Sequence, residues 1–227
     1  MKHYVGNDIV DLTDPRTQGR ESDTRFLQRV FTSEEREVIA SAPSPGTEVW
    51  CLWAAKEAAY KVVSKVLGTP PVFAHAAFAV QWHSREGDVL LGAVAYEGTN
   101  YPVRVERRTT AVHAVALSPR SQVLPVVAVE PLGDASLEEL MRSLTPRESE
   151  AVHSRASAAV RVGARRTVAG LLDLPEDHVE IVCDPGVTGR RPPRVFVGGR
   201  PGPADVSLSH HGAFVAWAVL VQKPLGR

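Results

Sequence analysis

The spacing of hydrophobic and polar positions along this chain predicts a mixture of helices and strands. β-Branched residues at 3–12 predict a strand, and the apolar spacing at 48–67 predicts a long helix that Gly68 ends. Thr47 is placed to cap the start of this helix, after a Pro/Gly-rich break at 43–46. Alternating segments separated by glycine or asparagine predict antiparallel strands at residues 73–82, 88–96, 101–107 and 110–118.

The remaining elements follow the same rules. A short amphipathic helix is expected at 25–31, and Thr32 or Ser33 caps the helix that follows it, with Glu35 or Arg36 at the capping-box distance. The rest of the chain is expected to hold strands at 126–132, 178–183, 194–197, 204–209 and 212–221, and helices at 135–143 and 146–173.

The order of these elements suggests an internal duplication, because a strand, helices, a long helix and further strands occur twice. The segments that align are 6–12 with 126–132, 31–37 with 144–150 and 111–117 with 213–219, while Lys56-Glu57 falls opposite Arg165-Arg166. We therefore predict an α+β fold made of a pseudo-twofold pair of similar lobes. Each lobe is expected to pack a long helix on a small antiparallel sheet, with residues 1–120 in the first lobe and 121–227 in the second.

Polar residues distinguish the two copies. The first copy has Asp8 and Glu57 where the second has Ala128 and Arg166, and the second copy has the segment SLSHHG at residues 207–212. A site between the lobes would therefore combine carboxylates on one wall with histidine and arginine on the other. Such a combination suits a metal-bound polyphosphate, because carboxylates bind divalent cations and cationic groups bind phosphate.

Charge and composition narrow the possibilities. Lys plus Arg and Asp plus Glu each number 26, so no overall field attracts nucleic acid or a membrane surface. Arginine is concentrated in residues 142–200, which indicates a local anion site. Cys51 and Cys183 have no partner at metal or redox spacing and are expected to be buried reduced thiols. No signal peptide or transmembrane run is apparent, so a cytoplasmic enzyme is expected.

Several motifs together resemble a known family, the 4'-phosphopantetheinyl transferases. The segments that resemble the small holo-acyl-carrier-protein synthases are GNDIVDL at residues 6–12, RVFTSEE at 29–35 and WAAKEA at 53–58. Those that resemble the larger two-lobed, surfactin-synthetase-type enzymes are SLSHHG at 207–212, the pair Arg161 and Arg165 on one helix, and GRRP at 189–192. The motifs lie in consistent places over most of the chain.

The chain also departs from the two-lobed enzymes. In those enzymes the Ser-His lobe precedes the acidic lobe, whereas here the acidic lobe comes first, so the two halves look exchanged. Val10 stands where the two-lobed enzymes often have a third carboxylate, as in the small synthases. Water would fill that metal position. Asp11 is not a substitute, because neighbouring residues of a strand point to opposite faces.

The resemblance implies transfer of the phosphopantetheine arm of coenzyme A to a serine of an apo acyl or peptidyl carrier protein, with Mg²⁺. Asp8 and Glu57 would hold the metal, and Glu57 would accept the serine proton directly or through a water. Lys61 would steady the pyrophosphate. The coenzyme A contacts are expected from Lys56, Lys61, Arg161, Arg165, Arg190, Arg191, Ser209 and His210. A monomer is expected, because one chain supplies both walls.

Other functions fit parts of the same pattern. The chain could be a non-catalytic module that binds coenzyme A or a carrier protein through a decayed site, or an enzyme acting on another nucleotide diphosphate. Glu57 and Lys61, spaced by four on a helix, also match an ordinary surface salt bridge. The sequence does not identify the carrier protein or the surface that binds it.

Some residues near these motifs have simpler interpretations. Arg165 and Arg166 could form the solvated face of their helix. Trp50 and Trp53 are three residues apart and are expected in the core. His211 is expected to have a structural role beside His210.

Overall fold

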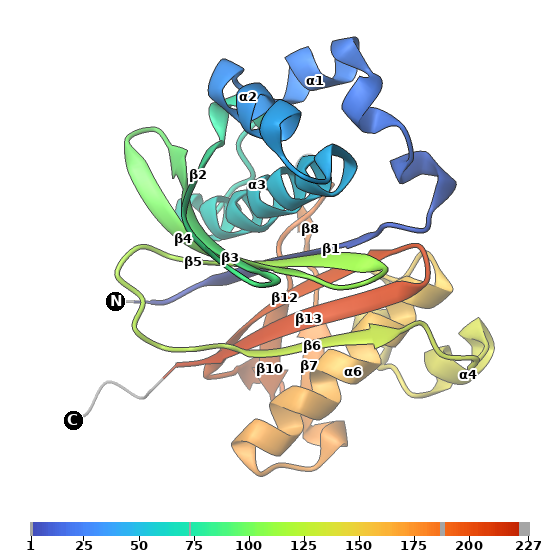
Figure 1. Ribbon diagram of the computed structural model, residues 1–227. Coiled ribbons are helices and arrows are strands. Elements are labelled where there is room, and N and C mark those ends of the chain that lie inside the picture. Colours follow the sequence, from blue (N-terminus) through green and yellow to red (C-terminus); the bar gives the residue numbers. More distant parts are fainter. Residues whose placement is uncertain (1, 73, 187–188, 223–227) are drawn as a thin grey trace.

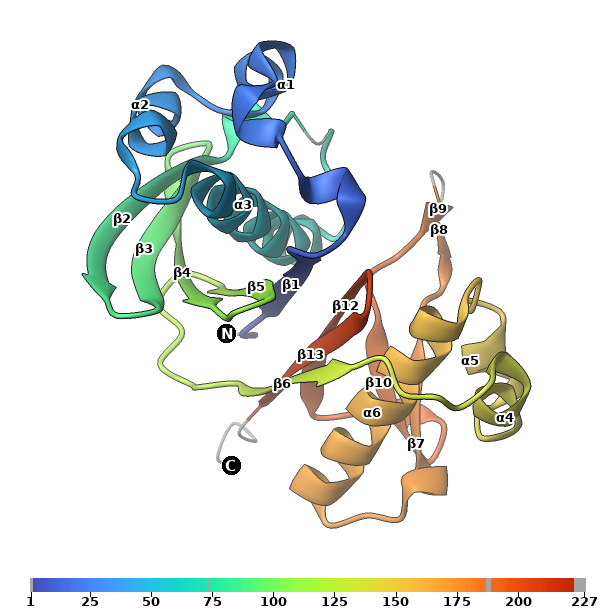
Figure 2. The same cartoon turned by 45° about the vertical axis from the view of Figure 1, so that its right-hand side comes forward.

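The predicted α+β class is confirmed: the computed structural model packs helices on antiparallel sheets (Figure 1). It describes residues 2–72, 74–186 and 189–222, with only the backbone at Gly189 and Arg190. Elements β1 to β5, with the helices among them, form the N-terminal half of the molecule. Elements β6 to β13 form the C-terminal half, which lies beside the first (Figure 2).

In the N-terminal half, one antiparallel sheet in the order β1-β5-β4-β3-β2 carries helix α3 on one face. Its strands are β1 (Val5–Asp11), β2 (Ala79–Glu86), β3 (Val89–Tyr96), β4 (Thr99–Arg107) and β5 (Ala111–Leu117). Its helices are α1 (Thr24–Val30), α2 (Ser33–Ser41) and α3 (Pro45–Leu67), with 3₁₀ turns η1 (Pro15–Thr17), η2 (Arg20–Ser22) and η3 (His75–Ala77). The strand order leaves the outer edge of β1 without a strand partner in its own sheet.

In the C-terminal half, helix α6 packs against the antiparallel sheet β12-β13-β6 and against β7. The strands of this half are β6 (Val126–Pro131), β7 (Val179–Val182), β8 (Pro185–Gly186), β9 (Gly189–Arg190), β10 (Arg194–Val197), β11 (Arg200–Pro201), β12 (Ala204–His211) and β13 (Phe214–Val221). Its helices are α4 (Leu137–Arg142), α5 (Pro146–Ser149) and α6 (Arg155–Leu172), with the 3₁₀ turn η4 (Glu176–His178). Strands β7, β10 and β11 form a second small sheet, and β8 and β9 pair as a hairpin.

The predicted boundaries of α3 are correct at its end and wrong at its start. Gly68 closes the helix in the left-handed conformation, with a φ of 74°. The helix begins at Pro45, because proline suits the first helical position, and Ser44 takes the cap position. Thr47 therefore lies inside the first turn, where its hydroxyl is 3.0 Å from the Ser44 hydroxyl.

Two other predicted segments are interrupted. The single helix predicted at 146–173 divides into α5 and α6, because Ser154 caps a new helix by accepting the backbone N–H of Ser157. The strand predicted at 73–82 begins only at Ala79, after the 3₁₀ turn η3. Residue 73 itself lies outside the described part of the chain.

The two sheets lie between the two long helices, so that α3, one sheet, the other sheet and α6 follow one another (Figure 1). The alternation along β1 explains this arrangement. Val5 and Ile9 point towards the C-terminal half and pack against β13. Gly6 points towards α3, where a Cβ atom would overlap the carbonyl of Ala58, so glycine allows β1 to lie close against the helix.

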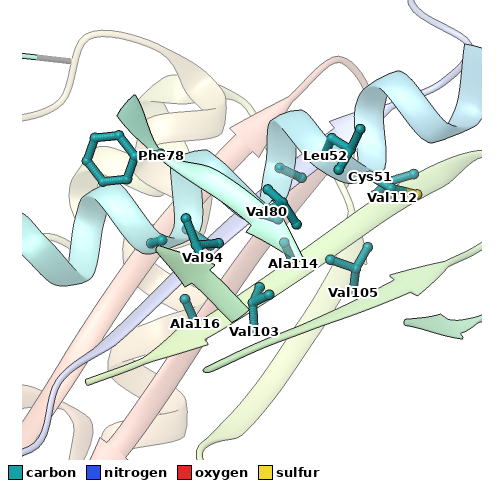
Figure 3. Close-up of a cluster of buried hydrophobic side chains, with 14 of the residues drawn as sticks. Cys51, Leu52, Phe78, Val80, Val94, Val103, Val105, Val112, Ala114 and Ala116 are labelled. Atoms are coloured by element: carbon teal, nitrogen blue, oxygen red, sulfur yellow. The ribbon is translucent and has the colours of Figure 1, made fainter. Parts of the chain in front are cut away.

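The largest hydrophobic core fills the space between α3 and the sheet of the N-terminal half (Figure 3). Leu52 and Cys51 of α3 are fully buried there, and Val105 and Val112 meet them from the sheet. This core fixes α3 relative to β1, which is the strand that carries Asp8.

A regular set of hydrogen bonds joins the halves. The outward backbone N–H groups of β1 donate to side chains of β12, and the partners are always 200 residues apart because the two strands run in the same direction. The pairs are Val5 with Asp205 (2.8 Å), Asn7 with Ser207 (2.9 Å), Ile9 with Ser209 (3.1 Å) and Asp11 with His211 (3.0 Å). We call these four contacts the β1–β12 ladder. They satisfy donors that the edge of a sheet would otherwise leave unpaired.

Candidate active site

The two predicted walls of the site meet in one pocket between the halves. Asp8 on β1 and Glu57 on α3 line this pocket together with His210 and His211 of β12. The acidic pair comes from the N-terminal half and the histidines come from the C-terminal half. The structure therefore brings together residues that are about 150 to 200 positions apart in the sequence.

Asp8 is held from two sides. Its Oδ1 atom accepts a hydrogen bond from the Lys61 ammonium at 2.9 Å and another from the Ser209 hydroxyl at 3.0 Å. Burial raises the pKa of Asp8 above its ordinary value and outweighs the Lys61 charge, which lowers it, while the nearby Glu57 carboxylate adds to the increase. A cation placed between the two carboxylates would relieve this cost.

Helix spacing places three charged side chains along the outer edge of β1. Glu57, Lys61 and Lys65 follow one another at intervals of four and share one helix face. Lys65 donates to the carbonyl oxygen of Val5, and Lys61 to that of Asn7, both at 2.7 Å. The ion pair that Lys61 forms is with Asp8, across the helix–strand contact, so it is not a simple surface pair with Glu57.

His75 is a neighbour of Glu57 that the sequence did not suggest. Its Nε2 atom lies 3.8 Å from Glu57 Oε1, and its ring packs on Trp53 with centroids 4.5 Å apart. The indole of Trp53 also stacks on Phe26, as expected for a core residue. Trp53 lines the pocket as well, so core packing is only one of its contacts. No local sequence pattern marks His75. It lies next to Glu57 because the segment between α3 and β2 folds back over α3.

His210 of the C-terminal half has positively charged neighbours from both halves. Burial lowers the pKa of His210, and the neighbouring His153, Lys61 and Arg161 lower it further. His211 instead accepts the backbone N–H of Asp11, as expected for a structural residue. The positive surroundings of His210 would attract an anion to this side of the pocket.

Arg161 of α6 is a buried cation. Only 6% of its surface is exposed, and its guanidinium donates to the carbonyl oxygen of Ser157 at 2.8 Å and lies 3.4 Å from the sulfur of Cys183. Within the described residues it forms no ion pair, and its Nε has no hydrogen-bond partner. A buried charge is costly unless it is paired, so an anion that reached this guanidinium would stabilise it.

Two predicted coenzyme A contacts occupy structural positions instead. Lys56 is fully buried, and its ammonium lies 2.7 Å from a carboxylate oxygen of Glu35. Arg165 is 5% exposed and pairs with Glu148 at 2.9 Å. Both cations form buried ion pairs within their own half, so neither is exposed to a ligand. Arg166, the neighbour of Arg165, does lie on the solvated face of α6.

These two ion pairs have the same arrangement of contacts in the two halves. Glu35 closes a capping box with Thr32 at the start of α2 and accepts the backbone N–H of Val80. In the other half, Glu148 closes a capping box at the start of α5 and accepts the backbone N–H of Ile181. Both glutamates lie in the segments 31–37 and 144–150, which align in the sequence. Each one connects a capped helix, a long helix and a strand.

The other predicted contacts are distributed as follows. Arg191 is exposed and lines a groove of about 600 Å³ between the halves, together with Lys61 and Leu208. This volume is in the range of ligand pockets. Arg190 lies in β9, and its side chain is outside the described atoms. The hydroxyl of Ser209 lies between the Ile9 N–H and the Asp8 carboxylate.

The donor set of the pocket suits a hard divalent cation. Within the described residues, no group of three or more His, Cys, Asp and Glu side chains could hold a metal ion. Asp8 and Glu57 are a pair of carboxylates, and Mg²⁺ typically uses one or two carboxylates together with water and substrate phosphate.

In the part of the chain that is described, no helix is both long enough and apolar enough to cross a bilayer.

Comparison with known proteins agrees with this geometry. Residues 4–114 match the family model of the 4'-phosphopantetheinyl transferase superfamily. This match spans β1 to most of β5 and includes Asp8, Glu57 and Lys61. This stretch, 111 of the 227 residues, therefore carries a domain of that superfamily, which indicates a transferase of the phosphopantetheine-transferring kind. A search of curated proteins found no significant match.

Proposed function

We propose that the protein transfers 4'-phosphopantetheine from coenzyme A to a serine of an acyl or peptidyl carrier protein in a Mg²⁺-dependent reaction. The observation that supports this most is the shared pocket of Asp8, Glu57 and His210. It combines two carboxylates for a metal with a histidine whose positively charged neighbours favour a phosphate. The superfamily match supports the type of transfer, and the donor, the acceptor and the metal are our proposals.

Asp8 and Glu57 are the residues that would hold Mg²⁺. When bound, the ion would neutralise charge on the pyrophosphate of coenzyme A. Val10 lines the same pocket with an apolar side chain and offers no third carboxylate. Water would therefore complete the coordination. This set of ligands matches the preference of Mg²⁺ for few protein ligands.

Lys61 and Glu57 would carry the charge and proton changes of the reaction. The serine oxygen forms a bond to the β-phosphorus, the bond from that phosphorus to the bridging oxygen breaks, and 3',5'-ADP leaves with that oxygen. Glu57 would accept the serine proton directly or through an ordered water. The side chain of Lys61 is 28% exposed, so its ammonium can reach the pyrophosphate and stabilise the charge that develops there.

The phosphates of coenzyme A would be bound mainly by the C-terminal half. His210 lines the catalytic pocket, Arg161 has a guanidinium without an ion pair among the described residues, and Arg191 lines the adjoining groove. We assign the acidic lobe to residues 1–120 and the phosphate-binding lobe to residues 121–227. We propose a pseudo-twofold relation between them, supported by the repeated buried ion pairs of Glu35 and Glu148. A cytoplasmic monomer is part of this proposal.

The decisive experiment is the mass of an apo carrier protein incubated with coenzyme A, Mg²⁺ and this protein. A gain of one phosphopantetheine is expected with the wild type, and it should disappear with Glu57→Gln and Asp8→Ala. Glu37→Gln is a matched control, because Glu37 is exposed on α2 and is not among the residues that line the pocket. Absence of any gain across fatty acid, polyketide and nonribosomal peptide carriers would contradict the proposal.

A further inference from the structure

Ser209 differs from the other members of the β1–β12 ladder in having a second partner in the pocket. Its Oγ atom lies 3.1 Å from the backbone nitrogen of Ile9 and 3.0 Å from Oδ1 of Asp8. Ser207, two residues earlier, makes the same kind of contact with the backbone nitrogen of Asn7, at 2.9 Å. Both serines are buried and both belong to β12. Only the contact made by Ser209 extends to a proposed metal ligand.

The chemistry of the two partners fixes the direction of each hydrogen bond. The backbone N–H of Ile9 can only donate, so the Ser209 oxygen must accept there. A serine hydroxyl has a single proton, and the Asp8 carboxylate is the acceptor that remains. The proton of Ser209 is therefore committed to Asp8. It is not available to donate to a phosphate oxygen, which is the role that the sequence suggested.

Asp8 is oriented by both halves of the molecule. Within the described residues, its two side-chain hydrogen bonds go to the same atom, Oδ1, from Lys61 of α3 and from Ser209 of β12. Two donors on one oxygen fix the plane of the carboxylate. The other oxygen, Oδ2, is then the one available to a cation.

We propose that Ser209 is a positioning residue that orients Asp8 for the metal ion and so makes metal binding depend on contact between the two halves. This inference rests on the proposed function, because it assigns Asp8 to the metal. Groups that orient a metal ligand without touching the ion commonly change metal affinity by about 10–100-fold when they are removed. Ser209 would act in this way through a single hydrogen bond.

The test is the affinity of the whole protein for Mn²⁺ alone, a paramagnetic substitute for Mg²⁺, measured by electron paramagnetic resonance titration without coenzyme A. Ser209→Ala should weaken binding about tenfold or more, as an orienting residue would. Ser209→Thr, which keeps the hydroxyl, should restore most of the affinity. Asp8→Ala should remove binding at this site and so show that the signal comes from it.

Ser207→Ala is the matched control, because it removes a buried hydroxyl from the same ladder without touching Asp8. It should lower the urea midpoint about as much as Ser209→Ala does and leave Mn²⁺ affinity within about twofold of wild type. If Ser209→Ala fails to fold, Ser209→Cys and Ser207→Cys give the same comparison with side chains of similar size.

The possible outcomes separate this inference from the proposed function. Equal Mn²⁺ affinity in Ser209→Ala and Ser207→Ala would overturn the positioning role, while leaving the Asp8 site and the transfer reaction intact. Wild-type protein that bound no Mn²⁺ would overturn the positioning role, and the carrier-protein assay would still decide the transfer reaction. Mn²⁺ binding with the expected order of variants, but no transfer to any carrier, would support the positioning role and contradict the transfer reaction.

Discussion

Lys56 of α3 and Glu35 of α2 form an ion pair of 2.7 Å in the interior of the N-terminal half, one residue before the proposed base, Glu57. The pair joins the capped start of α2 to the long helix, and Glu35 also holds the first residues of β2 through Val80. Adjacent residues on α3 therefore have different tasks. Lys56 supports the fold and Glu57 faces the pocket.

The first prediction concerns Lys56→Ala. This substitution leaves the Glu35 carboxylate buried and unpaired, so the free energy of unfolding should fall by about 3–5 kcal/mol, the range for breaking a buried pair. Urea denaturation measures the loss. Lys61→Ala is the comparison on the same helix: it should lower kcat by roughly 10²-fold or more and change stability much less, because Lys61 is partly exposed. Equal effects of the two variants on stability would contradict the division of tasks.

A second prediction follows from His113 on β5. Burial, together with the charges of Arg108, Lys61 and Arg104, lowers the pKa of His113 to about 3 in the folded protein. The unfolded chain binds the proton near the ordinary value of about 6.5. Stability from this residue is therefore fully present above pH 6.5 and is lost as the pH falls towards 3, by about 1.4 kcal/mol per pH unit for one proton.

His113→Gln should flatten this acid-side decline in the free energy of unfolding, measured by urea titrations between pH 7 and pH 4. The neutral imidazole contacts the side chain of Asn7, and glutamine can keep a polar contact at that place. His83→Gln, at an exposed position on β2, serves as the control and should leave the slope unchanged. An unchanged slope in His113→Gln would show that other groups cause the acid sensitivity.

The third prediction concerns Gly6. An added Cβ would overlap the backbone carbonyl of Ala58, and backbone cannot move aside as a flexible side chain can. Gly6→Ala should therefore push β1 away from α3, with a loss of about 1–3 kcal/mol of stability. The displacement also separates Asp8 from Glu57 and should reduce the rate of transfer. Gly133→Ala, where a Cβ would meet nothing within 4 Å, is the control.

The sequence predicted which faces of β1 and α3 the acidic residues occupy, because helix and strand periodicity determine those faces. Glu57 and Lys61 share a face through their spacing of four, and Asp8 and Asp11 point to opposite faces through the alternation of β1. Asp11 indeed turns away and accepts the backbone N–H of Ala213. Most strands were also predicted to within a few residues, since turns and alternation mark their ends.

The errors have a common cause, which is that a charged residue does not reveal its partner. Lys56 and Arg165 resembled ligand-binding cations, yet each meets a buried glutamate from a helix about 20 residues earlier. A signal did exist: the capping boxes at Thr32 and Thr145 lie in the segments 31–37 and 144–150, which align in the sequence, and the two cations also align. The second contact of Ser209 had no such signal, because it depends on how two distant strands approach each other.

The β1–β12 ladder also has a consequence for synthesis of the chain. β1 is made first, whereas the residues of β12 that cover its edge are made 200 residues later. At roughly 5–20 residues per second, the ribosome needs about 10–40 s to supply them. From the time β5 is made and pairs with β1 until β12 is made, the nascent N-terminal half presents an uncovered strand edge to other nascent chains. Slowing of elongation in the second half of the message should therefore increase aggregation of this protein more than slowing in the last few codons.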